Sequence, residues 1–231
     1  MYGINSDLLE RFDNIRTVYK HLELMQNGDV RYEVVFTEQI DVITCTKAGI
    51  VLMLYNAVES IMTKCIARIH QALIGDNLRF DDCNDAIQKL IIVYYENAKS
   101  KRSNIHDQVP YIVALHNYLS GNCTFNLSQD EMSKYYTLYS GNLDAKEVRG
   151  VLKQYGINSD GNERLHVSEL QSIKNYRNQL AHGEKSFHEI GTAITIQQVE
   201  IMIEKTQGFL NALVDVINDY ITNQEYKKTT T

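Results

Sequence analysis

The stretch RNQLAH, residues 177–182, places an arginine, an amide and a histidine within about one and a half turns of a predicted helix. Arginine binds anions through a planar fork of N–H donors, and histidine takes up and releases protons near neutral pH. Two interpretations are open. The stretch is either an ordinary helix end or the acid–base and anion-binding part of an active site.

Helical geometry gives these side chains one polar edge. Asn178 and His182 are four residues apart and share a face, Lys174 lies one turn earlier on that face, and Arg177 is displaced by about one residue's rotation. Gly183 follows directly, which predicts that His182 is the last helical or C-cap residue. The imidazole would then lie at an open helix end, where a histidine that only compensates the helix dipole is also common.

The same spacing of arginine and histidine occurs a second time in the chain. Arg16 and His21, in RTVYKH, also have four residues between them. Arg16 is followed by threonine, His21 lies inside a continuing helix, and no glycine frees its end. Spacing alone is therefore weak, and the asparagine and the terminal glycine distinguish RNQLAHG.

Composition predicts long helices around this stretch. The 231 residues include a single proline, which helices reject from their interiors, and 44% apolar residues, which suffice for a core. A first helix is predicted from the apolar stripe Leu8, Leu9, Phe12, Ile15, Tyr19, Leu22 and Met25. A second, central helix is expected from about Thr46 to Leu73. Residues 28–45 between them fit a strand, a loop or an early helical turn equally well.

Shorter helices follow. Serine, threonine or aspartate three residues before an acid or amide predicts helix starts at 128–131, 144–147, 168–171 and 195–198. The third start opens the helix that carries RNQLAH, and the fourth opens a long last helix. The chain is interpreted as a single domain, 1–231, with a helical insertion at about 75–160 and a frayed tail at about 224–231.

Charge and cysteine usage exclude several classes of protein. A net charge of −6 opposes general coating of nucleic acid, so any such contact requires a local basic patch. Cys45 and Cys65 lie in apolar surroundings and are predicted to be small buried residues. The pattern of cysteine and histidine predicts no metal site and no disulfide framework, and no cofactor is indicated. The short apolar run GIVLMLY and the lack of a leader pattern predict a cytoplasmic protein without membrane contact.

The chain resembles the HEPN superfamily in three places. RNQLAH is similar to its motif, in which arginine, a polar residue and a histidine four to six positions beyond the arginine lie near the end of the last core helix. LMLYNAVESIMTKCI resembles the long second helix of that fold. SGNLDAKEVRGVLKQYGI resembles a segment that precedes the motif helix in stand-alone prokaryotic members encoded near restriction and abortive-infection genes.

This resemblance implies an all-α bundle of long antiparallel helices that forms a homodimer with the two motif helices facing each other. It also implies a metal-independent endoribonuclease, because RNA supplies its own nucleophile in the ribose 2′-OH. His182 would exchange the proton, Arg177 would hold the phosphate oxygens, and Asn178 would orient His182 or the phosphate. The second acid or base would come from a composite site across the two-fold axis.

Two further positions carry alternatives. Lys174 is a candidate contact to the RNA phosphate, or a solvated lysine. Asn56 and Glu59, three residues apart on the second helix, are candidate supporting residues, because a carboxylate among apolar residues needs a partner. Arg177 is one candidate partner for Glu59, and a solvent-facing helix surface is the alternative.

Two functions from different classes follow. The first is an RNase used in phage defence or as a toxin, with an antitoxin or a neighbouring ATPase as candidate partner. The second is a HEPN-like dimer that binds nucleotide, RNA or protein without cleaving. Some relatives carry a modified tyrosine two residues after the motif histidine, and this chain has Glu184 there, which argues against that mode of control.

Overall fold

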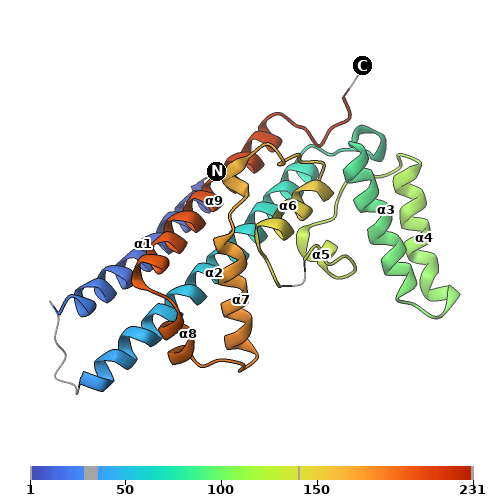
Figure 1. The fold of residues 1–231 in the computed structure, drawn as a ribbon. Coiled ribbons are helices and arrows are strands. Elements are labelled where there is room, and N and C mark those ends of the chain that lie inside the picture. Colours follow the sequence, from blue (N-terminus) through green and yellow to red (C-terminus); the bar gives the residue numbers. More distant parts are fainter. Residues whose placement is uncertain (1, 29–35, 140, 230–231) are drawn as a thin grey trace. The chain divides into compact units, whose positions relative to one another are not determined.

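The structure is a computed structural model that describes residues 2–28, 36–139 and 141–229 (Figure 1). These residues form nine α-helices and two short 3-10 helices, and no strand occurs among them. The all-α class predicted from the single proline and the helical periodicity is confirmed.

The helices and 3-10 helices are numbered in the order in which they occur along the chain. Their bounds are α1 (Tyr2–Gln26), α2 (Phe36–Gly75), η1 (Phe80–Asp82), α3 (Asp85–Ser100), α4 (Ile105–Leu119), α5 (Gln129–Ser133), α6 (Ala145–Gln154), η2 (Glu163–Leu165), α7 (Glu169–Ala181), α8 (Phe187–Ala193) and α9 (Ile196–Thr222).

The chain divides into two compact units. The first contains residues 1–62, 142–145 and 163–214, and the second contains 63–141, 146–162 and 215–231. The second unit includes most of the insertion predicted at about 75–160, which stays a prediction. The second unit also takes the last turns of α2 and α9, while four residues, 142–145, belong to the first unit.

In the first unit α1 lies along α9, where Arg16 Nη2 donates a hydrogen bond to Gln207 Oε1 at 2.7 Å (Figure 1). The predicted α1 stripe is buried except for Leu9, which is 60% exposed. Leu9 follows Leu8 by 100° of helical rotation, so both cannot face the same core. The apolar core of α1 is formed by Leu8, Phe12, Ile15, Tyr19, Leu22 and Met25.

Helix α2 begins at Phe36, about ten residues before the predicted start at Thr46. Of the residues left open at 28–45, those at 29–35 lie outside the described part, and 36–45 are helical. Cys65 is buried as predicted, but the prediction for Cys45 is wrong, because its position on this longer helix is exposed. The segment Glu38–Gly75 is long and apolar enough to cross a membrane, but 56% of its most apolar window is buried, as a core helix requires.

Helix α8 packs directly on the backbone of α2. A Cβ atom added to Gly191 would lie 1.8 Å from the carbonyl oxygen of Thr44, so the two helices approach as closely as a glycine allows. The Lys47 ammonium is buried and donates to the carbonyl oxygen of Ile194, the C-cap of α8, at 2.6 Å. Burial lowers the pKa of Lys47. These contacts fix the chain that follows the motif helix.

The second unit is organised around a buried histidine. His70 Nδ1 lies 2.6 Å from the Leu127 carbonyl oxygen and must donate to it, so Nε2 accepts from the Tyr155 hydroxyl at 2.8 Å. The Tyr155 carbonyl oxygen accepts in turn from the Tyr220 hydroxyl at 2.6 Å. The ring of His70 is therefore satisfied as one neutral tautomer.

The end of the chain is held to this unit as far as residue 228, whose backbone N–H donates to the Asp82 carbonyl oxygen at 2.8 Å. Tyr226 is buried and donates to Asp76 at 2.9 Å, and Lys227 forms an ion pair with the same carboxylate at 2.8 Å. Residues 224–228 therefore depart from the fraying predicted for about 224–231, and residues 230–231 of that range lie outside the described part. The buried Tyr226 ring and the backbone hydrogen bond from Asn84 to the Tyr226 carbonyl oxygen, 2.8 Å, hold the segment in place.

Replacing Gly191 by alanine should destabilise the protein by about 3 kcal/mol or more, the upper end of what overpacking costs. The new Cβ would meet the Thr44 backbone, which cannot rotate away. Urea unfolding measures the free energy. Gly49→Ala on α2 is the matched control, because its Cβ would meet nothing within 4 Å and should stabilise the helix slightly. Equal stability of the two variants would contradict the close approach of α8.

Stability should fall as the pH drops below about 6.5, because burial lowers the pKa of His70 in the folded state. Below that pH the unfolded chain binds a proton at His70 more tightly than the folded protein does, which lowers the free energy of unfolding. The contribution of neutral His70 to stability is therefore complete above about pH 6.5 and is lost as the pH falls. Thermal unfolding between pH 7.5 and 5 measures the effect. His70→Gln should flatten the profile, whereas a change at the exposed His106 should leave it intact. A parental profile as flat as that of His70→Gln would refute this role.

Candidate active site

The motif helix α7 ends as the glycine at 183 predicts. His182 is the C-cap, and Gly183 has a left-handed φ of 69°. The Gly183 N–H donates to the Leu180 carbonyl oxygen at 3.2 Å, and the Glu184 N–H donates to the Gln179 carbonyl oxygen at 2.9 Å. This pair of bonds is the Schellman arrangement, which satisfies the last carbonyl groups of a helix.

The start of α7 differs from its prediction. Ser168 has helical backbone angles, with φ −72° and ψ −26°, and its side chain caps no backbone N–H. A serine accepts such a bond from an extended conformation, so the predicted box at 168–171 does not form. The matching box at 195–198 is confirmed, because Thr195 and Gln198 exchange both bonds. Ser128 likewise caps Glu131 as predicted.

Arg177 lies against the face of a buried tyrosine. Its guanidinium carbon is 4.6 Å from the ring centroid of Tyr55, which α2 supplies. Nη1 donates to Asn178 Oδ1 at 3.0 Å. Within the described residues the structure gives Nε and Nη2 no hydrogen-bond partner and gives Arg177 no carboxylate. The guanidinium is thus fixed on one side while it keeps its charge and several donors.

Tyr55 connects Arg177 to Glu59. The Tyr55 hydroxyl donates to Glu59 Oε1 at 2.9 Å and accepts from the backbone N–H of Leu143 at 3.2 Å. Burial, with a smaller effect of the bond to Glu59, raises the pKa of Tyr55 to about 12, so the hydroxyl keeps its proton at neutral pH. Glu59 therefore supports Arg177 through the tyrosine, and the direct pair predicted as one alternative is absent from the described contacts of Arg177.

Three successive residues before α6 hold the motif helix. Asn178 Nδ2 donates to Asn142 Oδ1 at 2.8 Å, and the Leu143 N–H binds Tyr55. Asp144, which is buried, forms an ion pair with Lys174. Segment 142–144 thus holds α7 through two side-chain contacts, which join residues 30 and 36 positions apart in the sequence.

The contact of Lys174 with Asp144 bears on its predicted role. The sequence suggests Lys174 as a phosphate contact or as a solvated lysine, and the structure gives its ammonium a carboxylate partner instead. The side chain of Lys174 is 17% exposed, so it is not a freely solvated cation. Asn56, the other supporting residue predicted on α2, is exposed.

His182 lies at the exposed end of the helix. Its backbone N–H donates to the Asn178 carbonyl oxygen at 3.0 Å, and no partner is given for its imidazole among the residues that the structure describes. Asn178 thus bonds to Arg177 and Asn142 through its side chain rather than to His182. The imidazole is open to a substrate, whereas the arginine is held in place.

Sequence reasoning missed Tyr55, Asn142 and Asp144. Tyr55 could have been found from its four-residue spacing to Glu59, because residues four apart on one helix are neighbours. Asp144 was assigned to the start of α6, which it does precede, but its pairing with Lys174 links residues 30 positions apart. The hydrophobic periodicity of a single helix cannot predict a contact between two separate segments.

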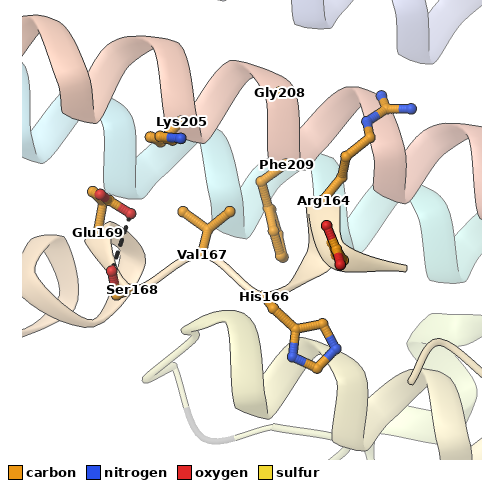
Figure 2. A pocket seen from close by; sticks show the side chains of 9 residues that line it. Arg164, His166, Val167, Ser168, Glu169, Lys205, Gly208 and Phe209 are labelled. Atoms are coloured by element: carbon orange, nitrogen blue, oxygen red, sulfur yellow. Dashed lines mark hydrogen bonds between the residues drawn. The ribbon is translucent and has the colours of Figure 1, made fainter. Parts of the chain in front are cut away.

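A separate hollow lies beside the start of α7, with a volume of about 400 Å³ (Figure 2). Arg164 and Lys205 line it together with Glu163 and Glu169, and the Ser168 hydroxyl donates to Glu169 at 3.3 Å. Charges of both signs therefore meet there, so the hollow favours neither anions nor cations. No group of three or more His, Cys, Asp or Glu residues in the described part is placed to hold a metal ion.

The arginine–asparagine–histidine edge on an all-α fold is what the HEPN resemblance predicts, and comparison with protein families identifies the class. The profile of the MAE_28990-like HEPN family matches residues 3–226. The chain belongs to this family. The comparisons with curated proteins and with solved structures gave no match.

Replacing Tyr55 by phenylalanine should cost about 1–3 kcal/mol of stability, because the buried Leu143 N–H and the partly buried Glu59 each lose a hydrogen bond. The ring that carries Arg177 would remain. Urea unfolding measures the loss, with Tyr176→Phe on α7, a partly exposed tyrosine, as the control. A Tyr55→Phe protein as stable as the control would contradict the supporting role of this hydroxyl.

Proposed function

We propose that this protein is a metal-independent endoribonuclease that cuts RNA through attack of the ribose 2′-OH. One observation carries the proposal. Arg177 is held on the Tyr55 ring with its charge unneutralised, and His182 ends the same helix with an open imidazole. An anchored cation and an accessible proton carrier are what this reaction needs from a protein.

Arg177 would stabilise the phosphorane-like transition state. The charge on the non-bridging oxygens grows as O2′ attacks phosphorus, and the free N–H groups of the guanidinium can bind two of these oxygens together. An aromatic face holds the arginine without cancelling its charge, as a carboxylate would. Asn178 adds to this by fixing Nη1.

His182 would exchange the protons of the reaction. A neutral imidazole takes the proton from the 2′-OH as the O2′–P bond forms, and a protonated group donates to O5′ as the P–O5′ bond breaks. The products are a 2′,3′-cyclic phosphate and a 5′-hydroxyl, so atoms and charge balance without a co-reactant. Each motif supplies one histidine, and we propose that a homodimer provides the second group at a composite site.

The biological use that we propose is phage defence or a toxin activity in the cytoplasm, with an antitoxin or a neighbouring ATPase as regulator. Glu184, where some relatives carry a modified tyrosine, makes control by modification at that position unsuitable. The motif end is nevertheless exposed and open to a covering partner.

A second candidate function is a HEPN dimer that binds nucleotide, RNA or protein without cleaving it. The observation that favours it is electrostatic. The chain carries a net charge of −6, and the one lysine on the motif edge is neutralised by Asp144. An RNase with this net charge has few cationic side chains near the motif with which to attract RNA, a polyanion.

Purified protein should cleave total cellular RNA in EDTA and leave 2′,3′-cyclic phosphate ends. His182→Ala should lower the rate by at least about 100-fold, the usual contribution of acid–base catalysis. Gel analysis followed by end-group analysis measures both. Arg177→Ala should also abolish cleavage, since nothing else on this edge retains a free positive charge.

The matched control is His21→Ala, because Arg16 and His21 have the spacing of the motif without its asparagine or terminal glycine. This variant should cut RNA at the parental rate when its melting temperature is unchanged. No cleavage by a verified dimer, or cleavage indifferent to His182, would overturn the RNase proposal and favour the binding module.

A further inference from the structure

The second unit contains a cavity of about 330 Å³, lined by residues of that unit alone. Side chains of α3 and α6 line it, together with Tyr136, which follows α5. The volume lies at the small end of the range for sites that bind small molecules. It suits a ligand of about one nucleotide rather than a larger cofactor.

The charge of this cavity is of one sign. Lys89 from α3 and Lys153 from α6 line it, both are exposed, and the lining includes no acidic residue. Neither ammonium forms an ion pair with a residue in the described part of the chain. In a protein of net charge −6, two lysines at one cavity form a local site for an anion.

The polar groups of the cavity are set to donate hydrogen bonds. The Tyr136 hydroxyl donates to Gln154 Oε1 at 2.8 Å, which holds the side-chain amide of Gln154 while its two N–H groups remain donors. Both lysines are donors only. The walls between them are apolar, formed by Leu90 and Val93. The complementary ligand is therefore rich in acceptors and has an apolar face.

Gly150 leaves one wall of the cavity without a side chain. It lies in the middle of α6, where glycine costs about 1 kcal/mol relative to alanine, and it lines the cavity. An added Cβ would meet nothing within 4 Å, so packing within the protein does not require glycine there. A bare stretch of helix backbone lets a flat group approach closely.

We propose that this cavity binds a phosphorylated nucleotide, either free or as one residue of a single-stranded RNA. Lys89 and Lys153 bind the phosphate. The base lies between the Leu90–Val93 wall and the bare backbone at Gly150, and the Gln154 amide donates to a carbonyl oxygen or ring nitrogen of the base. Binding here requires no cleavage, so this site stands or falls independently of the proposed RNase activity.

The test measures binding with the full-length His182→Ala protein, which leaves RNA intact. The probes are AMP, followed by calorimetry, and a fluorescein-labelled eight-nucleotide oligouridylate, followed by fluorescence polarisation at several salt concentrations. The variants are Lys89→Ala with Lys153→Ala, and Gly150→Gln, which fills the cavity without changing charge. Lys146→Ala, an exposed lysine on the same helix α6 outside the lining, is the matched control.

The double lysine variant should weaken binding at least about tenfold. It should reduce the slope of log affinity against log salt for the oligouridylate by about 1.4, since each lost phosphate contact on a single strand is worth about 0.7. Gly150→Gln should weaken binding with the slope unchanged, and Lys146→Ala should stay within about twofold of the parent. Binding of AMP assigns the site to free nucleotides, and binding of the oligouridylate alone assigns it to a strand.

Two results would overturn the proposal. One is that the parent protein binds neither probe. The other is that Gly150→Gln binds as tightly as the parent, since the phosphate would then be held on the outer surface and not in the cavity. Circular dichroism of each variant verifies that it is folded, and Gly150→Gln places a good helix former at an open helical position.

Discussion

The contact between the Arg177 guanidinium and the buried ring of Tyr55 is the constraint on which the motif depends. The Tyr55 hydroxyl donates to Glu59 and accepts from the Leu143 N–H, so the ring is held in one orientation. An arginine paired with a carboxylate would be equally well placed but electrically cancelled. Lys174, paired with Asp144 one turn earlier, shows that alternative on the same helix. The aromatic contact keeps the positive charge available for an anion.

The other half of the motif depends on how α7 ends. Gly183 in its left-handed conformation closes the helix, so His182 stands at the terminus and not within a packed ridge. The chain then enters α8, which is held on α2 by the close approach of Gly191 to Thr44 and by Lys47. The same helix α2 thus supports the arginine through Tyr55 and anchors the segment after the histidine. Rigid support of this kind is what a preorganised site requires.

The sequence was informative wherever a signal is local. The helical class follows from the single proline, and the end of α7 follows from Gly183, because each depends on backbone preferences of a few residues. The early start of α2 could not be predicted, since the β-branched residues at 36–45 favour strands locally and tertiary packing overrides that preference. The role of Tyr55 and the pairing of Asp144 with Lys174 depend on contacts between distant segments, which no local pattern encodes. The resemblance of SGNLDAKEVRG to HEPN proteins gave no information on the contacts of Asn142 and Asp144 within it.

The most direct test of the account asks whether the nucleophile belongs to the RNA. A synthetic RNA that the protein cuts at a mapped linkage would be compared, in EDTA, with the same strand carrying a 2′-O-methyl group at that linkage alone. The account predicts that cleavage stops at the modified linkage and continues at unmodified ones, because Arg177 and His182 supply charge stabilisation and proton transfer but no nucleophile. Continued cleavage at the modified linkage would mean that water or a side chain attacks, and it would contradict the mechanism.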